Sequence, residues 1–88
     1  MHSSQESLIQ KIIDAKADIT IGGVYAHYKN PSKTYEVQLL SFAEADETLQ
    51  VVYRALYGKR LSFVRPLVSW SENVEYDGQS VKRFRRIE

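Results

Sequence analysis

The stretch LQVVYRA, residues 49–55, decides the fold class, because its apolar side chains recur at every second position. Leu49, Val51, Tyr53 and Ala55 alternate with Gln50, Val52 and Arg54. Successive side chains of a β-strand point to opposite faces, so this spacing predicts a strand with one apolar face. Val52 makes the second face partly apolar as well, which predicts a strand inside a sheet rather than at its edge.

The residues before this strand predict two more strands. Residues 24–28, VYAHY, form a short aromatic run, and Asn30 and Pro31 give the turn that follows it. Residues 35–39, YEVQL, alternate cleanly, but Leu40 and Phe42 then move the apolar side chains to the other face. Such a change of phase within one strand predicts a β-bulge or a sharp bend.

The residues after the central strand predict a fourth strand, a helical turn and a hairpin. Residues 61–65 form the strand, which ends at a proline, and residues 67–73 could hold one helical turn that carries Trp70. The Asp77-Gly78 pair then separates residues 74–76 from residues 81–84. An Asp-Gly pair favours a two-residue type I′ turn, because both of its central residues need a positive φ.

The first 22 residues predict a helical extension. Ser3 and Glu6 have the spacing of a capping box, and Gly22-Gly23 ends the segment. The apolar residues at helical spacing are Leu8, Ile9, Ile12, Ile13 and Ala17. A helix this short needs packing to be stable, so we expect Ile9, Ile12 and Ile13 to be buried against the sheet or against a second chain.

Taken together, the patterns predict one mainly β domain over residues 1–88, with the helix in 1–22 and the sheet in 23–88. Since no helix separates the strands, they should be antiparallel, in a small barrel or a curled sheet of five to six strands. With 88 residues, a net charge of +1 and no cysteine, the chain is neither a strongly basic nucleic-acid binder nor a disulfide scaffold. Without a signal or membrane segment, we expect a cytoplasmic protein.

Several motifs in this order resemble a bacterial family known as domain of unknown function 1653. The similarity covers Gly23 to Ile87 and rests on residues 23–29, 35–37, 51–58, 64–67 and 74–84. The resemblance implies a barrel that is SH3-like in outline, and it implies no activity. Ala26 stands where a basic residue is usual in the family, and Phe63 stands where tryptophan is common.

Chemistry that depends on a recognisable motif is missing from the sequence. His2 and His27 are too few and too far apart to predict a metal site, and the nearest match to a nucleophile elbow, residues 78–82, lacks its last glycine. No phosphate-binding or dinucleotide-binding loop is present. We therefore expect no cofactor and no catalytic residue, and an enzyme is the least favoured class of function.

Clustered aromatic and basic residues predict a binding module instead. We expect a concave ligand site made of Tyr25, His27, Tyr53, Arg54, Tyr57 and Arg65, with Trp70 as a wall. Arginine beside tyrosine suits a peptide or a small polar ligand that is anionic at one end. Nucleic acid is the less favoured ligand, a membrane is not expected, and the chain should be a monomer or a weak dimer.

Each of these features also has a purely structural interpretation. The tyrosines could be core side chains with their hydroxyls at the rim, and His27 could be a hydrogen-bonded residue of the barrel lining. The basic residues Lys82, Arg83, Arg85 and Arg86 could be the solvated edge strand that charged side chains protect from pairing with other chains.

Overall fold

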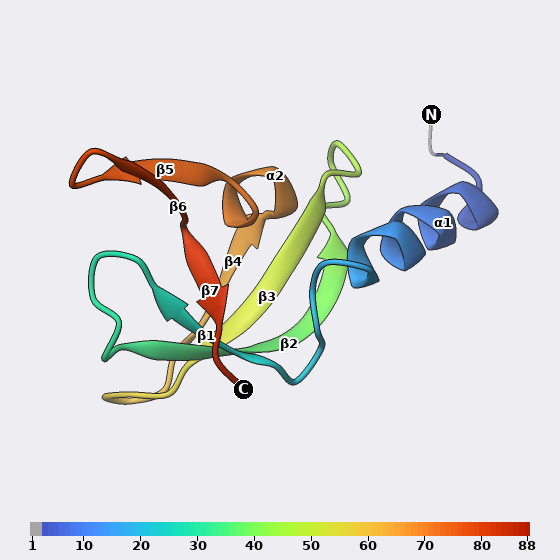
Figure 1. The fold of residues 1–88 in the computed structure, drawn as a ribbon. Helices are drawn as coiled ribbons and strands as arrows, with labels where there is room; N and C mark the ends of the chain where they lie inside the picture. Colours follow the sequence, from blue (N-terminus) through green and yellow to red (C-terminus); the bar gives the residue numbers. More distant parts are fainter. Residues whose placement is uncertain (1–2) are drawn as a thin grey trace.

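A computed structural model describes residues 3–88, which form two helices and seven strands (Figure 1). In chain order they are α1 (Gln5–Lys16), β1 (Val24–His27), β2 (Thr34–Phe42), β3 (Leu49–Ala55), β4 (Ser62–Pro66), α2 (Leu67–Trp70), β5 (Asn73–Tyr76), β6 (Gln79–Lys82) and β7 (Phe84–Arg86). One sheet has the order β4-β3-β2-β1-β7, and β5 pairs with β6 in a separate hairpin. All pairs are antiparallel, which confirms the mainly β prediction.

The predicted change of phase in the second strand is a β-bulge. The pairing of β2 with β3 shifts register between Val37 and Leu39. Val37 is completely buried, whereas Leu39 is 48% exposed, and Leu40 again packs against the core. The inserted residue therefore keeps apolar side chains on the inner face as β2 bends around that face (Figure 1).

The sheet stays open, so the SH3-like barrel is not confirmed. Within residues 3–88 no strand pairing joins the edge strands β4 and β7, and the alternative of an open, curled sheet describes the fold. Side chains bridge this opening in place of a ladder. Trp70 of α2, directly after β4, stacks on Phe84 of β7 with ring centroids 3.8 Å apart. Two large rings fill the space that closing strands would occupy.

The number of strands was also predicted wrongly, because the last expected strand is two strands. β6 pairs with β5 in the hairpin, whereas β7 pairs with β1 in the main sheet. Arg83 lies between them: its backbone N–H donates to the carbonyl of Glu72, and its carbonyl accepts from the N–H of Tyr28. These bonds to two different elements turn the chain at Arg83 and split the strand.

The predicted hairpin turn and helical turn are both confirmed. Asp77 and Gly78 have φ values of 53° and 75°, the positive values that a type I′ turn requires. Trp70 ends the four-residue helix α2. It belongs to a buried cluster between the curled sheet and α2, made of Ile19, Tyr25, Val37, Val51, Tyr53, Trp70 and Phe84.

Helix α1 begins one residue later than the capping box predicted. Ser4 is the N-cap, and its hydroxyl accepts from the N–H of Ser7 at 3.2 Å. Ser3 instead bonds to the carboxylate of Glu47 in the β2–β3 turn, through its N–H at 3.0 Å and its hydroxyl at 2.9 Å. The predicted Ser3–Glu6 capping box is therefore wrong, because Ser3 bonds to a carboxylate on another element. No local sequence motif indicates that partner.

Most of the apolar stripe of α1 is not covered by the sheet. The helix extends away from the sheet (Figure 1), and Ile9 and Ile13 are each 55% exposed, so burial against the sheet was wrongly predicted for both. Leu8 and Ile12 are half-buried, and Ala15 is buried. In the part of the chain that the structure describes, neither helix has the length and apolar character needed to cross a membrane.

Candidate functional site

Three of the seven predicted site residues pack a ring against Phe84, a residue that was not predicted to be part of the site. Trp70 stacks on the Phe84 ring, and His27 and Tyr53 meet it at centroid distances of 5.2 and 5.7 Å. Tyr25 reaches the cluster through the edge of Trp70, at 5.3 Å. The inner face of the sheet therefore brings together Tyr25, His27, Tyr53 and Trp70.

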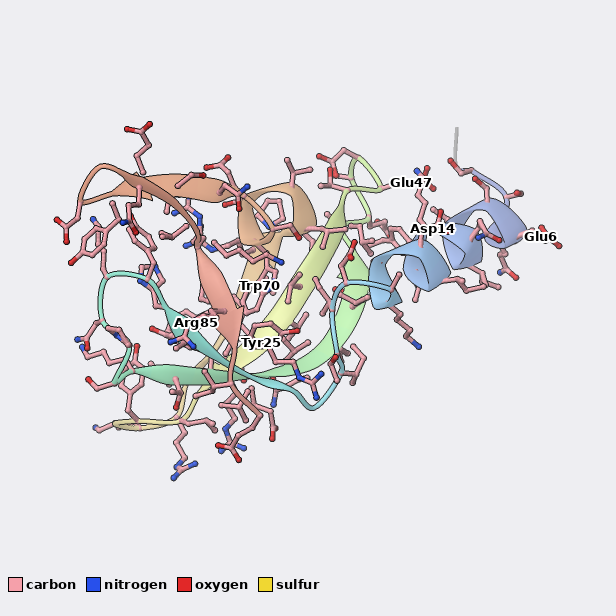
Figure 2. The ribbon with its side chains drawn as sticks, viewed as in Figure 1. Glu6, Asp14, Tyr25, Glu47, Trp70 and Arg85 are labelled. Carbon is pink, nitrogen blue, oxygen red and sulfur yellow. The ribbon has the colours of Figure 1, made fainter. Side chains whose placement is uncertain are left out.

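Burial limits what this aromatic cluster can do. Tyr25, Tyr53 and Trp70 are at most 7% exposed, and Tyr25 and Trp70 lie inside the fold (Figure 2). The Tyr25 hydroxyl accepts a hydrogen bond from the backbone N–H of Thr20 at 3.1 Å, which fixes the segment after α1. Rings of this kind hold the fold together and can offer only an edge to a ligand.

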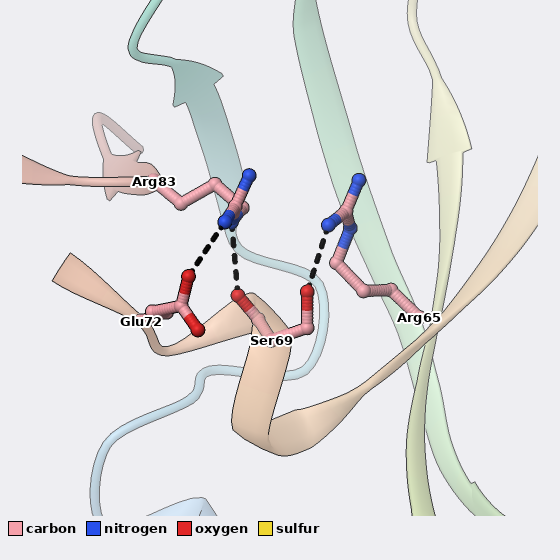
Figure 3. Close-up of polar contacts among 4 residues, drawn as sticks. All are labelled: Arg65, Ser69, Glu72 and Arg83. Atoms are coloured by element: carbon pink, nitrogen blue, oxygen red, sulfur yellow. Dashed lines mark hydrogen bonds and ion pairs between the residues drawn. The ribbon is translucent and has the colours of Figure 1, made fainter. Parts of the chain in front are cut away.

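Arg65 lies against the same cluster but is engaged with α2. Its guanidinium carbon is 5.6 Å from the centroid of the Phe84 ring, and Nη1 donates to the hydroxyl of Ser69 at 2.8 Å (Figure 3). Its Nε is buried and has no hydrogen-bond partner within residues 3–88. Arg65 therefore brings a partly buried positive charge to the inner face.

Arg83 completes this arrangement from the other side of α2. Its Nε donates to the carbonyl of Ser69 at 3.1 Å, and its Nη2 forms an ion pair with Glu72 at 2.8 Å (Figure 3). Two arginines thus hold one helical turn through Ser69. Arg83 therefore has a structural role, in which it holds α2 in place. This role distinguishes Arg83 from the other basic residues near the C-terminus.

His27 is half-buried at the edge of the cluster and favours its neutral form. Burial, followed by the positive charges of Arg65, Arg83 and Lys29, holds the pKa of His27 below its usual value. Nδ1 accepts from the N–H of Lys29 at 3.1 Å, so the neutral ring carries its proton on Nε2. Near pH 7 His27 can donate one hydrogen bond but adds no positive charge.

Tyr57 is displaced from the cluster and forms a pair with Tyr35. The two hydroxyl oxygens are 2.6 Å apart, and burial together with this bond raises the pKa of Tyr35 to about 12. The Nζ atom of Lys33 lies 5.1 Å from the centroid of the Tyr57 ring. Tyr35 links the pair to Tyr53 at 5.5 Å, so Tyr57 is at the margin of the predicted site.

Arg54 does not join the other predicted residues. It follows Tyr53 in β3 and is exposed on the opposite face of that strand, where its Nε donates to the carbonyl of Arg60 at 3.1 Å. Adjacent strand residues cannot share a face, so the sequence itself excluded a common site for Tyr53 and Arg54.

A cleft of about 410 Å³ lies between the β5–β6 hairpin and the end of β1. We call it the hairpin cleft; its lining consists of Ala26, His27, Tyr28, Pro31, Tyr76, Val81, Lys82 and Arg85. Tyr28 and Tyr76 meet edge to face at 5.5 Å and connect the two sides. Of the seven predicted site residues, His27 is the one that lines this cleft.

A second cleft of about 650 Å³ lies among the segment after α1, the end of α2 and β7. It has a more polar lining, made of Ala17, Asp18, Ile19, Thr20, Tyr25, Trp70, Ser71, Asn73, Lys82, Phe84, Arg85 and Arg86. Lys82 and Arg85 line both clefts, and neither makes an ion pair within residues 3–88. The clustering of basic residues near the C-terminus is a sequence signal that could have indicated Lys82 and Arg85 as site residues. No sequence signal places Tyr76 opposite Tyr28.

Metal chemistry finds no support in the part of the chain that was described. Among residues 3–88, no group of three or more His, Cys, Asp or Glu side chains is arranged to hold a metal ion. The hairpin cleft instead combines positive charges, apolar walls and a neutral imidazole.

Comparisons with known proteins agree with the predicted resemblance. The family model described as "Protein of unknown function (DUF1653)" matches residues 23–86, a range that leaves out α1. A solved structure of a DUF1653 protein from Bordetella bronchiseptica is similar over 81% of this chain and 90% of that chain, with 30% sequence identity and a TM-score of 0.70. No curated protein matches the chain.

Proposed function

Because this chain belongs to the DUF1653 family, whose function is unknown, we propose a function from its geometry: a ligand-binding module whose site is the hairpin cleft. The observation that carries the proposal is the combination, in one cleft, of apolar aromatic walls and two positive charges that have no carboxylate partner within residues 3–88. The ligand that fits is a peptide or a small molecule with an apolar body and an anionic end.

The walls of the cleft support the apolar part of this ligand. Tyr28 and Pro31 provide one side, and Tyr76 and Val81 of the hairpin provide the other. A volume of about 410 Å³ lies within the range of roughly 300–1,000 Å³ that is usual for small-molecule sites. One aromatic side chain or a ring of similar size could pack against these apolar walls beside the Tyr28–Tyr76 pair.

The charges at the cleft support the anionic end. Arg83 already has Glu72 as its partner, whereas Lys82 and Arg85 have no acidic partner in residues 3–88. A guanidinium group can bind a carboxylate through two parallel hydrogen bonds, and an ammonium group adds a point charge. The neutral His27 can add a hydrogen bond from Nε2 without adding charge.

The buried aromatic cluster argues against nucleic acid as the ligand. Binding of single strands depends on exposed rings on which successive bases stack. Tyr25, Tyr53 and Trp70 are at most 7% exposed, and the net charge of the chain is only +1. Tyr57 and Arg65 have partners within the fold, Tyr35 and Ser69. Contacts of these two residues with a ligand stay a prediction.

Titration with a matched pair of peptides tests the proposal. We expect acetyl-Gly-Phe with a free carboxylate to shift the amide NMR signals of Tyr28, Tyr76 and Arg85. Its C-terminal amide should bind at least about tenfold more weakly, because it lacks the charge that Lys82 and Arg85 attract. A single-stranded oligonucleotide, titrated over a range of salt concentrations, serves as the alternative ligand.

Two arginine variants locate the site. Arg85→Gln should weaken binding of the free carboxylate by at least about tenfold and leave binding of the amide unchanged. Arg54→Gln is the matched control, since Arg54 is exposed on the outer face of β3. Equal binding of both peptides, an equal effect of both variants, or tighter and strongly salt-dependent binding of the oligonucleotide would contradict the proposal.

A further inference from the structure

The uncovered face of α1 is apolar in the middle and charged at the ends. Ile9 and Ile13 lie one helical turn apart, each 55% exposed. Helical spacing of 3.6 residues per turn also puts Glu6 and Lys16, both exposed, on this side of the helix. Glu6 projects away from the sheet at the far end of α1 (Figure 2).

Polar and half-buried residues border this face. Gln10 donates to Asp14 at 2.9 Å on one side of the isoleucines, and the half-buried Leu8 and Ile12 lie on the other. The apolar stripe is therefore partly buried, and Ile9 and Ile13 form its exposed part. Two neighbouring exposed isoleucines form a small apolar patch, and covering it with a second surface is favourable.

The four residues are symmetric about Lys11. Ile9 and Ile13 lie two residues before and after it, and Glu6 and Lys16 lie five residues before and after it. When two copies of such a helix pack antiparallel, each residue before the centre meets the corresponding residue after the centre on the partner. Ile9 then faces the partner's Ile13, and Glu6 faces the partner's Lys16.

We propose that α1 is a self-association surface, on which two copies of this chain pack their helices antiparallel through Ile9 and Ile13. The contact occurs twice in the dimer, with both Glu6–Lys16 pairs formed, and it closes at two copies because each face is used completely. Antiparallel alignment also places opposite ends of the helix dipoles side by side. This inference is independent of the hairpin cleft, which lies on other elements.

A second copy fits this surface better than an unrelated partner does. The charge pattern is self-complementary: an acid in the first turn and a base in the last turn match only when the partner helix carries the same order in reverse. The helix has 12 residues and is about 18 Å long, so the contact is smaller than a standard interface of about 1,600 Å². The dimer should therefore be weak and depend on concentration.

Sedimentation velocity of the full chain tests the proposal first. From about 10 µM to about 1 mM, the weight-average sedimentation coefficient should rise from the monomer value toward the dimer value. Ile9→Ser should raise the dimer dissociation constant at least about tenfold, because each dimer loses the contact twice. Val68→Ser is the matched control, since Val68 is 79% exposed on α2 and should leave the constant unchanged.

Charge exchange tests the antiparallel alignment. Glu6→Lys alone and Lys16→Glu alone each bring like charges together, so each variant by itself should dimerise several-fold more weakly than wild type. Mixed in equal amounts, the two variants should form a heterodimer in which every pair has opposite charges. Far-UV circular dichroism of each variant checks that α1 is still helical, since both substitutions oppose the helix dipole.

Three outcomes would overturn the inference. The first is a wild-type chain that stays monomeric up to about 1 mM. The second is a dimer that Ile9→Ser and Val68→Ser weaken equally, which would place the contact elsewhere. The third is a mixture of the two charge variants in which no heterodimer forms although the wild type dimerises, which would exclude the antiparallel pairing.

Discussion

Replacing Phe84 by alanine should remove a large part of the stability of this fold. Phe84 is 4% exposed and touches four aromatic rings, those of His27, Tyr35, Tyr53 and Trp70. A buried Phe→Ala substitution costs about 3–5 kcal/mol, and aromatic pairs add about 0.5–1.5 kcal/mol beyond the buried area. We expect a loss near the upper end, about 5 kcal/mol.

The total stability of the chain sets what this loss would do. An 88-residue domain is stable by about 4–13 kcal/mol, so Phe84→Ala should lower the urea midpoint by roughly 2–5 M or unfold the protein without denaturant. Trp70 is the single tryptophan and stacks directly on Phe84, so its fluorescence reports both the local packing and global unfolding. Phe84→Leu keeps most of the volume and gives a measurable midpoint if the alanine variant does not fold.

A second phenylalanine provides the control. Phe63 in β4 is 43% exposed and meets Tyr53 at 6.0 Å, so Phe63→Ala should cost only about 1 kcal/mol. If both alanine variants lowered the midpoint equally, the Trp70–Phe84 stack would not be the bridge between the sheet edges. The same conclusion would follow if Phe84→Ala kept the wild-type midpoint and the wild-type Trp70 emission maximum.

Three further outcomes follow from single residues. Because folding lowers the pKa of His27, the imidazole binds a proton more tightly in the unfolded chain than in the folded one. In urea melts at several pH values, the free energy of unfolding should not change above about pH 7 and should fall as the pH drops below about 6.5. His27→Gln should reduce this fall. Tyr57→Phe should shift the ultraviolet titration of Tyr35 from about 12 toward its ordinary value, because the hydrogen bond that contributes to the raised pKa is lost; an unchanged titration would mean that the bond to Tyr57 does not raise this pKa. Gly78→Ala should lower the thermal midpoint by several degrees, since alanine is strained at a φ of 75°, and an unchanged midpoint would contradict the assigned turn.

The local patterns predicted most of the strands, because they depend on spacing alone. The period of two in residues 49–55, the phase change after residue 39 and the Asp77-Gly78 pair each fix a feature within a few residues of themselves. The split at Arg83 depends on partners more distant in the sequence. Its backbone bonds reach Glu72 and Tyr28, and nothing in residues 81–84 indicates that the strand changes from the hairpin to the main sheet.

The candidate site was predictable only as far as strand faces allow. Tyr25 and His27 share a face by alternation, and the structure places Tyr25 against Trp70 and His27 against Phe84, in one aromatic cluster. Arg54 could have been excluded by the same rule, because it alternates with Tyr53. The hairpin cleft could not be predicted from the sequence, because it depends on the path that the chain takes over the sheet between β4 and β7.

The fold separates the residues that stabilise the protein from those that we propose bind a ligand. Phe84 and Arg85 are neighbours in β7, so their side chains point to opposite sides of the strand. One is buried in the aromatic stack; the other is exposed and lines both clefts. Substitution of Arg85 should therefore change binding without changing the urea midpoint, whereas substitution of Phe84 changes both. Alternation within a single three-residue strand is enough to place a structural role and a binding role side by side.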